Sequence, residues 1–290
     1  MCSSTTSPAN ITAEAFGKLL ARYPSVIAAV SEAKGAKPGQ KTLAELDTFR
    51  YTKAPATYSS TDGGAMTKSD VVKLVEWKLR HGKFRPTLMK LVESNSESAV
   101  EATVEEAVAK YRSTVAEIKG GVKLSGHVEA ALAAVKVLST MRGIGPATAS
   151  LLAAVHFPKE CIFFSDEAYA WLAGGSSHSP PSKYNIKEYE DVARGMVQLL
   201  RRLPDEYGAQ DVEQVAYVLM YDKTAPLAGK SKEAAKEPAP AKALKKETAP
   251  PAKLTAAKQS QESKKRKVPP TEAAVSSSDS VRRSSRHKSS

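Results

Sequence analysis

The sequence predicts an all-α protein: a flexible N-terminus over 1–10, a compact multi-helix domain over 11–222, and a disordered basic tail over 223–290. Three observations support this prediction. Apolar residues recur at helical spacing through most of the chain before the tail. Only one run, CIFF at 161–164, resembles a β-strand. The predicted helices and their connections are short, which is typical of one compact helical domain.

Each predicted helix has its own pattern. In the segment MTKSDVVKLVEWKLRHGKF, Thr67 is a favourable N-cap, and Asp70 lies in the first turn, where it complements the helix dipole. The apolar periodicity predicts the other helices over 11–22, 24–34, 41–49, 100–118, 128–141, 146–155, 186–200 and around 212–219.

The net charge of +12 belongs to the tail, which holds 17 Lys/Arg against 6 Asp/Glu, whereas 1–222 holds 26 against 25. Apolar residues are too sparse in the tail to offset chain entropy, so we expect disorder there. Lys264, Lys265, Arg266 and Lys267 form a dense cluster typical of a nuclear localisation signal. We therefore expect a nuclear protein that binds an import receptor; the alternative is a generic solvated tail.

Several classes of protein are excluded by composition. No apolar run reaches the roughly 18 residues of a membrane span, so no membrane partner is expected. The N-terminus lacks the basic and apolar regions of a signal peptide. Two cysteines, Cys2 and Cys161, exclude a disulfide framework and a four-cysteine cluster. The histidines are not spaced like metal ligands, so we expect no bound metal. We also expect a monomer.

A Gly-Ile-Gly-Pro sequence at 143–146 separates two Ala/Leu-rich helices. Gly143 is suited to ending the first helix in a left-handed conformation, and Gly145 leaves the backbone uncovered. Pro146 suits the first turn of the next helix, while Ile144 can pack between the two helices. Free N–H groups at that helix N-terminus would bind an anion such as phosphate. The alternative is a corner that only packs.

This segment resembles the helix-hairpin-helix motif, which binds the nucleic-acid backbone without reading sequence. The matching residues are Leu138, Met141, Gly143, Ile144, Gly145, Thr148 and Ala149. With the following residues, GIGPATASLLAAVHFPKECIFFSDEAYAWL, the chain resembles a divergent member of the helix-hairpin-helix/Gly-Pro-Asp DNA glycosylase superfamily. The resemblance is motif-specific over about 138–172 and extends in architecture over about 60–230.

The resemblance implies that double-stranded DNA is the partner and that Gly143, Ile144, Gly145 and Thr148 hold a backbone phosphate. It implies a role in base excision repair. No cofactor is expected, although hairpins of this kind can hold a monovalent cation through backbone carbonyls.

In that family an aspartate acts at the glycosidic bond of a flipped base, and Asp166 matches its position. Its carboxylate would stabilise oxocarbenium charge on the sugar and orient water. Bifunctional members carry a lysine two residues after the second hairpin glycine, where this chain has Ala147. The resemblance therefore implies a monofunctional glycosylase without lysine-based lyase activity by that route. The alternative is that Ser165, Asp166 and Glu167 only cap a helix.

Two further groups are candidate contacts. The basic cluster consists of Lys78, Arg80, Lys83 and Arg85. With Trp77 and Phe84 interleaved, it is suited to phosphate contacts and to stacking on an unpaired base. The alternative is a basic helix end with both aromatic residues in the core. Tyr169 and Trp171 follow Asp166 and are candidates for a base pocket, although core packing is their commoner role.

Three functions remain open at this point. The first is a nuclear, monofunctional DNA glycosylase-like enzyme, which needs a base-sized pocket facing Asp166. The second is a non-catalytic nuclear DNA-binding or chromatin-associated helix-hairpin-helix protein. The third is a helical protein-interaction domain, which predicts an exposed apolar patch.

Overall fold

The computed structural model describes residues 4–60, 63–118, 124–174 and 179–222, and most of these residues are helical. They belong to the first of two compact units, Met1–Glu237. No strand occurs among the described residues, which confirms the all-α prediction for that part of the chain. The CIFF run at 161–164 is a buried connection between helices. The predicted nuclear localisation signal at 264–267 lies outside the described residues.

The helices follow the predicted order. In chain order, the helical segments up to residue 93 are η1 (Ser4–Thr6), α1 (Ala13–Leu20), α2 (Tyr23–Lys34), α3 (Leu43–Thr48), the π-helical η2 (Phe49–Lys53), α4 (Ala54–Tyr58), α5 (Lys68–His81) and α6 (Leu88–Glu93). They are followed by α7 (Glu97–Ala116), α8 (Leu124–Leu138), α9 (Pro146–His156), α10 (Asp166–Leu172), α11 (Ile186–Leu200) and α12 (Ala209–Tyr221). Sequence analysis did not predict η1, η2, α4 and α6, because segments this short do not reveal a helical period.

The N-caps of two helices are as predicted. The Thr67 side chain accepts a hydrogen bond from the Asp70 N–H at the start of α5. The Ser165 Oγ accepts one from the Ala168 N–H, at 3.0 Å, at the start of α10. Each bond satisfies a backbone donor that the first turn of a helix leaves free.

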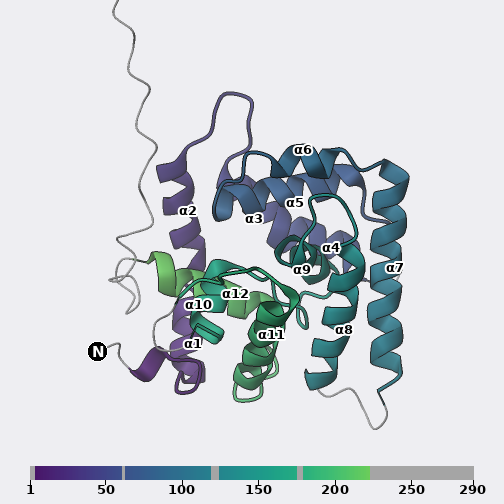
Figure 1. Ribbon diagram of the computed structural model, residues 1–290. Coiled ribbons are helices and arrows are strands. Elements are labelled where there is room, and N and C mark those ends of the chain that lie inside the picture. Colours follow the sequence, from purple (N-terminus) through teal and green to yellow (C-terminus); the bar gives the residue numbers. More distant parts are fainter. Residues whose placement is uncertain (1–3, 61–62, 119–123, 175–178, 223–290) are drawn as a thin grey trace, which may run out of the picture. The chain divides into compact units, whose positions relative to one another are not determined.

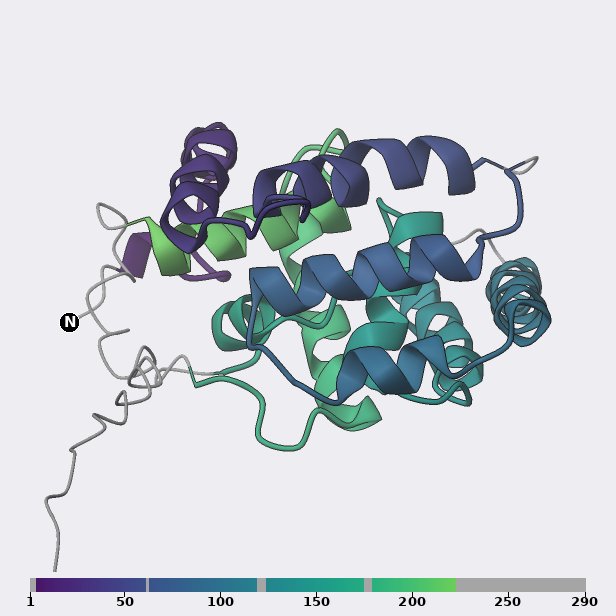
Figure 2. The ribbon, with the colours of Figure 1, turned by 90° about the horizontal axis from the view of Figure 1, so that it is seen from above.

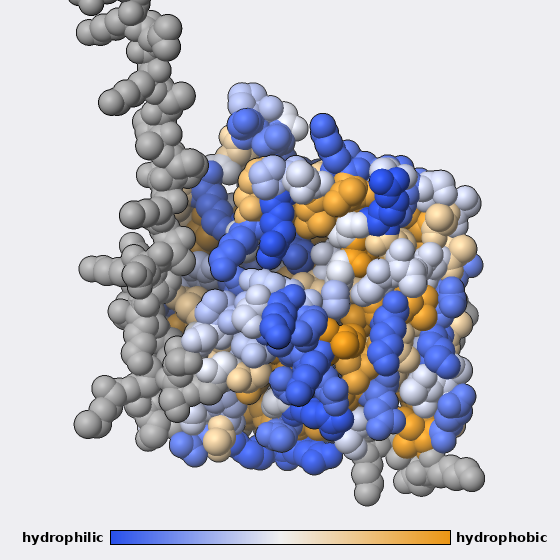
Figure 3. Space-filling model, viewed as in Figure 1, coloured by the Kyte–Doolittle hydropathy of each residue, from blue (hydrophilic) through white to orange (hydrophobic). Residues whose placement is uncertain are grey.

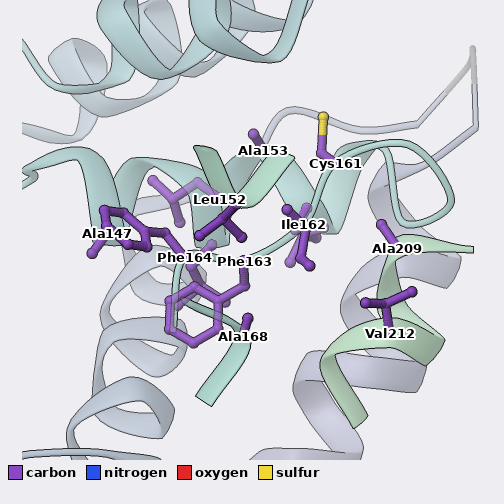
Figure 4. Packing of buried hydrophobic residues seen from close by; sticks show 14 of the residues in the cluster. Ala147, Leu152, Ala153, Cys161, Ile162, Phe163, Phe164, Ala168, Ala209 and Val212 are labelled. Carbon is purple, nitrogen blue, oxygen red and sulfur yellow. The ribbon is translucent and has the colours of Figure 1, made fainter. Parts of the chain in front are cut away.

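The central element of the core is α9, which contacts α4, α5, α7, α8 and α11 (Figure 1). Every residue from Ala147 to His156 is buried, so this helix has no solvent-facing stripe. Figure 2 shows α7 end-on with α8 beside it. In Figure 4, Leu152 of α9, Phe163, Ala168 of α10 and Val212 of α12 belong to one apolar cluster. The core therefore holds the start of α9 and the start of α10 in fixed positions.

Part of the N-terminus that was predicted to be flexible is instead anchored to the domain. The Trp171 Nε1 donates a hydrogen bond of 2.9 Å to the Thr6 carbonyl. Arg202 donates to the carbonyls of Pro8 and Ile11, each at 2.7 Å. These partners lie far away in the sequence, so local composition gave no indication of the contacts over 4–10.

A buried ion pair connects the two halves of the domain. Arg50 of η2 and Glu213 of α12 are 3.0 Å apart, and their side chains are 0% and 2% exposed. Glu213 also accepts hydrogen bonds from the Tyr51 hydroxyl at 3.0 Å and from the Phe163 N–H at 2.6 Å. Phe163 lies three residues before Asp166, so this ion pair supports the segment that leads to the candidate catalytic residue.

Candidate functional site

The connection between α8 and α9 turns at Gly143, which has a φ of +77°. A Cβ atom there would lie 2.8 Å from the Leu91 Cβ and 3.1 Å from the Val92 N, so only glycine fits. The predicted left-handed conformation is correct, but the predicted role as the end of the first helix is wrong. The α8 helix ends at Leu138, and turn residues fill the chain before Gly143.

Gly143 and Gly145 leave backbone N–H donors available in the connection between α8 and α9. Gly145 is the N-cap of α9, Pro146 occupies the first helical turn, and a Cβ on Gly145 would meet nothing within 4 Å. In the described part of the chain, the N–H groups of Gly143 and Gly145 have no hydrogen-bond acceptor. Ile144 is only 3% exposed, which agrees with its predicted packing role. Backbone donors at a helix N-terminus favour an anion.

Asn95 holds this connection in place from the end of α6. Its Oδ1 accepts a hydrogen bond from the Arg142 N–H at 3.0 Å, and its Nδ2 donates to the Arg142 carbonyl at 2.9 Å. The two bonds fix the backbone directly before Gly143.

Thr148 and Ile144 offer less to a phosphate than the sequence suggested. Thr148 is 4% exposed, and its N–H donates to the Gly145 carbonyl at 2.9 Å. The Ile144 N–H donates to the Met141 carbonyl at 3.2 Å. Of the four residues predicted to bind phosphate, Gly143 and Gly145 are the two that present unpaired N–H groups.

A pocket opens where the end of α5 meets the starts of α9 and α10. The cavity volume is only about 40 Å³, and the empty space reaches about 400 Å³ when the part open to solvent is included. The residues around it are Lys78, His81, Gly82, Lys83, Arg85, Ala147, Phe163, Phe164, Ser165, Asp166, Glu167 and Tyr184. The pocket therefore brings Asp166 to the same cavity as Ala147 in the first turn of α9.

Asp166 is held by two side chains at the pocket wall. The Tyr184 hydroxyl donates to its Oδ1 at 2.8 Å, and the Lys83 ammonium lies 3.3 Å from its Oδ2. The Arg85 guanidinium lies 5.1 Å from the centre of the Tyr184 ring, over its face. Sequence analysis missed Tyr184, because it lies in the loop over 174–185, where no pattern distinguishes one residue from the next.

The backbone of Tyr184 is strained, with a φ of +52°. Tyr184 is the only non-glycine residue among the described ones that has a positive φ. Such strain is common at functional sites, where the surrounding structure fixes an unfavourable conformation.

The predicted basic cluster divides into two groups. Lys78, Lys83 and Arg85 line the pocket. Arg80 does not, because its guanidinium pairs with Glu76 at 3.2 Å and donates to the Gln40 Oε1 at 2.8 Å.

The aromatic residues proposed for a base pocket, Tyr169 and Trp171, do not line this pocket. Trp171 is 4% exposed and packs in the core, and Tyr169 packs beside Phe164 without lining the pocket. The aromatic residues that line the pocket are Phe163, Phe164 and Tyr184. Tyr169 and Trp171 follow Asp166 by three and five residues along α10, but neither lines the pocket.

Glu167 and His81 are buried residues of the same wall. Glu167 accepts a hydrogen bond from the Tyr221 hydroxyl at 3.0 Å, and burial raises its pKa. The His81 ring lies between the rings of Trp77 and Tyr217, with centroids 4.5 and 4.3 Å away. Burial lowers the pKa of His81 well below its usual value, and its Nε2 has no partner among the described residues. A neutral imidazole with a free nitrogen therefore lines the pocket.

Phe84 projects into solvent beside the pocket, between Lys83 and Arg85. It is 73% exposed, whereas Trp77 is fully buried, so the two aromatic residues of the basic cluster have different roles. The other exposed large apolar residues of the described chain are Leu91 and Tyr221. Figure 3 shows a face on which hydrophilic side chains are interspersed with apolar ones.

Among the described residues, no group of three His, Cys, Asp or Glu side chains is arranged to hold a metal ion. No described helix is long and apolar enough to cross a membrane. No protein-family model, no curated protein and no solved structure matches the chain. The resemblance to the DNA glycosylases therefore stays a prediction, and the function is argued from the pocket and its surroundings.

Proposed function

We propose that the chain is a nuclear DNA glycosylase-like protein that cleaves an N-glycosidic bond in double-stranded DNA with the help of Asp166. The observation that carries this proposal is the pocket. It combines the Asp166 carboxylate, three basic side chains and the first turn of α9. The N-cap of that helix, Gly145, has open space around it. These are the groups that a protein needs to hold a phosphate backbone and act on one sugar beside it.

DNA binding in this proposal depends on two sets of donors. The N–H groups of Gly143 and Gly145 hold one backbone phosphate at the N-terminus of α9. Lys83 and Arg85 bind neighbouring phosphates at the mouth of the pocket. Lys83 is 60% exposed, so its pairing with Asp166 is weak and can be exchanged for a phosphate.

The chemistry requires the target base to leave the duplex and enter the pocket. As the glycosidic bond breaks, positive charge develops on the sugar, and the Asp166 carboxylate stabilises it. Water adds to C1′, and its proton leaves with the base, so the reaction is a hydrolysis. Tyr184 keeps the carboxylate oriented through its 2.8 Å hydrogen bond. Ala147 carries no amine, so position 147 provides no imine route.

Two residues are suited to base flipping, one by contacting the flipped base and the other by filling the gap that the base leaves in the duplex. His81 lines the pocket, and its buried Nε2 has no hydrogen-bond partner among the described residues, so this nitrogen would gain from a matching partner on a ligand that reached it. Phe84 is exposed beside the pocket and can occupy the gap that the flipped base leaves in the stack.

A second candidate function is favoured by the contacts of Asp166. Both of its oxygens have a partner, and the Ser165 cap accounts for this sequence without chemistry. A non-catalytic DNA-binding protein of the same architecture would keep the hairpin donors and the basic side chains.

Alkali cleavage of duplexes that carry a panel of damaged or mismatched bases tests the proposal. The full chain would be compared with Asp166→Asn, with Gly145→Val, and with Gly64→Val as a matched control. A Cβ is free of contacts at both glycines, so both valine variants should fold. Alkali-sensitive product that Asp166→Asn loses while it still binds would support the glycosylase. Binding without product, lost in Gly145→Val only, would leave the non-catalytic protein. Binding that Gly145→Val leaves intact would contradict both.

A further inference from the structure

A second cavity lies at the other end of α9 from the pocket at Asp166. Ala147, in the first turn of α9, lines that pocket, whereas His156, the last residue of α9, lines the second cavity. The second cavity has a volume of about 260 Å³, against about 40 Å³ for the first, and no described residue lines both. A cavity of roughly 150 Å³ is enough to bind benzene, so this one has room for a somewhat larger molecule.

The wall of the second cavity combines apolar side chains with an arginine. Met66 and Val104 are buried and Val108 is half-buried, and one turn after Val108 the exposed Arg112 also lines the cavity. The Arg112 guanidinium donates one long hydrogen bond, of 3.4 Å, to the Ser60 carbonyl, and no carboxylate of the described chain pairs with it. A guanidinium has five N–H groups in a planar fork that matches a carboxylate, so Arg112 has donors to spare for a ligand.

The charge of Arg112 acts on the cavity wall at His156. Burial lowers the pKa of His156 to about 4, the hydrogen bond to the Tyr58 carbonyl opposes this shift, and the positive charge of Arg112 adds to it. Glu105 also lines the cavity, but it lies two turns before Arg112 on α7, about 10 Å away along the helix axis. The end of the cavity at Arg112 therefore favours an anionic group.

The neutral His156 ring leaves one acceptor of this wall unpaired. Its Nδ1 lies 3.1 Å from the Tyr58 carbonyl, which can only accept a hydrogen bond, so Nδ1 carries the proton of the neutral ring. Its Nε2 is then an acceptor, and this buried nitrogen has no partner among the described residues. A hydroxyl or N–H group of a ligand that reached Nε2 would satisfy it.

We infer that the second cavity binds a small, largely apolar carboxylic acid that also carries a hydroxyl or N–H group. The carboxylate of this ligand pairs with Arg112, and its apolar body packs against Met66 and Val108. Its hydroxyl or N–H group donates to His156. The site is separate from the pocket at Asp166 and does not depend on the proposed glycosylase activity, so either proposal can fail without the other.

Saturation-transfer difference NMR with the full chain tests this inference on four probes of similar size. The first is 4-hydroxyphenylacetate, which has both the carboxylate and the hydroxyl. Phenylacetate lacks the hydroxyl, the alcohol tyrosol is neutral, and tyramine carries an ammonium in place of the carboxylate. We expect 4-hydroxyphenylacetate to bind with a Kd of about 1 mM or below, and at least about fivefold more tightly than each of the other three.

Three variants locate the binding in the cavity. Arg112→Gln should remove the advantage of 4-hydroxyphenylacetate over tyrosol. Ala109 is exposed and lines the cavity, so Ala109→Trp should fill part of it and weaken binding of the acid by at least about tenfold. The matched control is Ala102→Trp, at an exposed position of the same helix that does not line the cavity, and it should bind as the wild type does.

Far-ultraviolet circular dichroism shows whether each variant folds. Several results would overturn the inference: no binding of 4-hydroxyphenylacetate by the wild type, tighter binding of tyramine, or equal affinity for phenylacetate. Unchanged binding of the acid in a folded Ala109→Trp, or an undiminished preference for the acid in a folded Arg112→Gln, would overturn it as well.

Discussion

Replacing Glu213 by glutamine should destabilise the domain more than a typical substitution does. Glu213 and Arg50 are almost completely buried and lie 3.0 Å apart. Glutamine is nearly isosteric but keeps only one acceptor oxygen, whereas the Phe163 N–H donates to Oε1 and the Tyr51 hydroxyl to Oε2. The variant therefore loses one of these hydrogen bonds together with the charge that balances Arg50. Removing one partner of a buried ion pair costs about 3–5 kcal/mol, because the other charge remains buried without compensation. For a domain of this size, that corresponds to a fall in Tm of roughly 6–20 °C.

Urea denaturation followed by tryptophan fluorescence measures this cost directly. The two reporters, Trp77 and Trp171, are buried, and the Arg50 guanidinium lies 5.6 Å from the Trp77 ring centre. The midpoint should fall while the slope of the transition stays unchanged. The double variant Arg50→Met with Glu213→Leu should recover much of the loss, because no buried charge remains. A cost below about 1 kcal/mol, or a double variant no more stable than Glu213→Gln, would refute the reasoning.

Three other predictions follow from individual contacts. Burial raises the pKa of Asp47 to about 6, although Trp77 and Tyr23 donate hydrogen bonds to it. The contribution of Asp47 to the free energy of unfolding is therefore complete below pH 4, which is near the pKa of Asp47 in the unfolded chain. This contribution is lost as the pH rises through 6, which is near its pKa in the folded protein. The free energy of unfolding of Asp47→Asn, relative to wild type, should accordingly increase by about 2–3 kcal/mol between pH 4 and pH 7; a constant difference would contradict the assignment. Gly143→Ala should lower the free energy of unfolding by at least about 1 kcal/mol, because of its positive φ and the 2.8 Å contact with Leu91, whereas Gly145→Ala should stay within about 0.5 kcal/mol. Equal thermal stabilities for the two alanine variants would argue against this geometry. The double variant Lys83→Ala/Arg85→Ala should reduce the salt dependence of duplex binding, measured by fluorescence anisotropy, by close to two phosphate contacts, with a slope change of about 1.8; an unchanged slope would remove both side chains from the interface.

The sequence predicts the longer helices well, because their apolar residues repeat over several turns. The α11 and α5 helices agree with their patterns, and the Thr67 and Ser165 caps are where the residue types indicate. The α6 helix was not predicted, since it spans fewer than two turns. The anchoring of residues 4–10 depends on Trp171 and Arg202, and no local pattern encodes contacts at that separation.

The candidate site is only partly predictable for the same reason. Asp166, Lys83 and Arg85 were identified from local motifs and line one pocket. Tyr184 and the free Nε2 of His81 depend on how distant elements pack, so composition and spacing could not identify their roles. Helical spacing alone misplaced Tyr169 and Trp171, because proximity along a helix does not decide which residue faces a cavity.

The central claim is that the Asp166 carboxylate stabilises positive charge on a sugar in the pocket. It can be measured without knowing the base, by comparing duplexes with a cationic pyrrolidine and a neutral tetrahydrofuran in place of one nucleotide. A site complementary to the charged transition state binds its cationic analogue more tightly. We expect the full chain to prefer the pyrrolidine duplex by at least tenfold in Kd, and Asp166→Asn to lose that preference while it binds the neutral duplex as before. Equal affinity of the wild type for both duplexes, or a preference that survives in Asp166→Asn, would contradict the proposed role of Asp166.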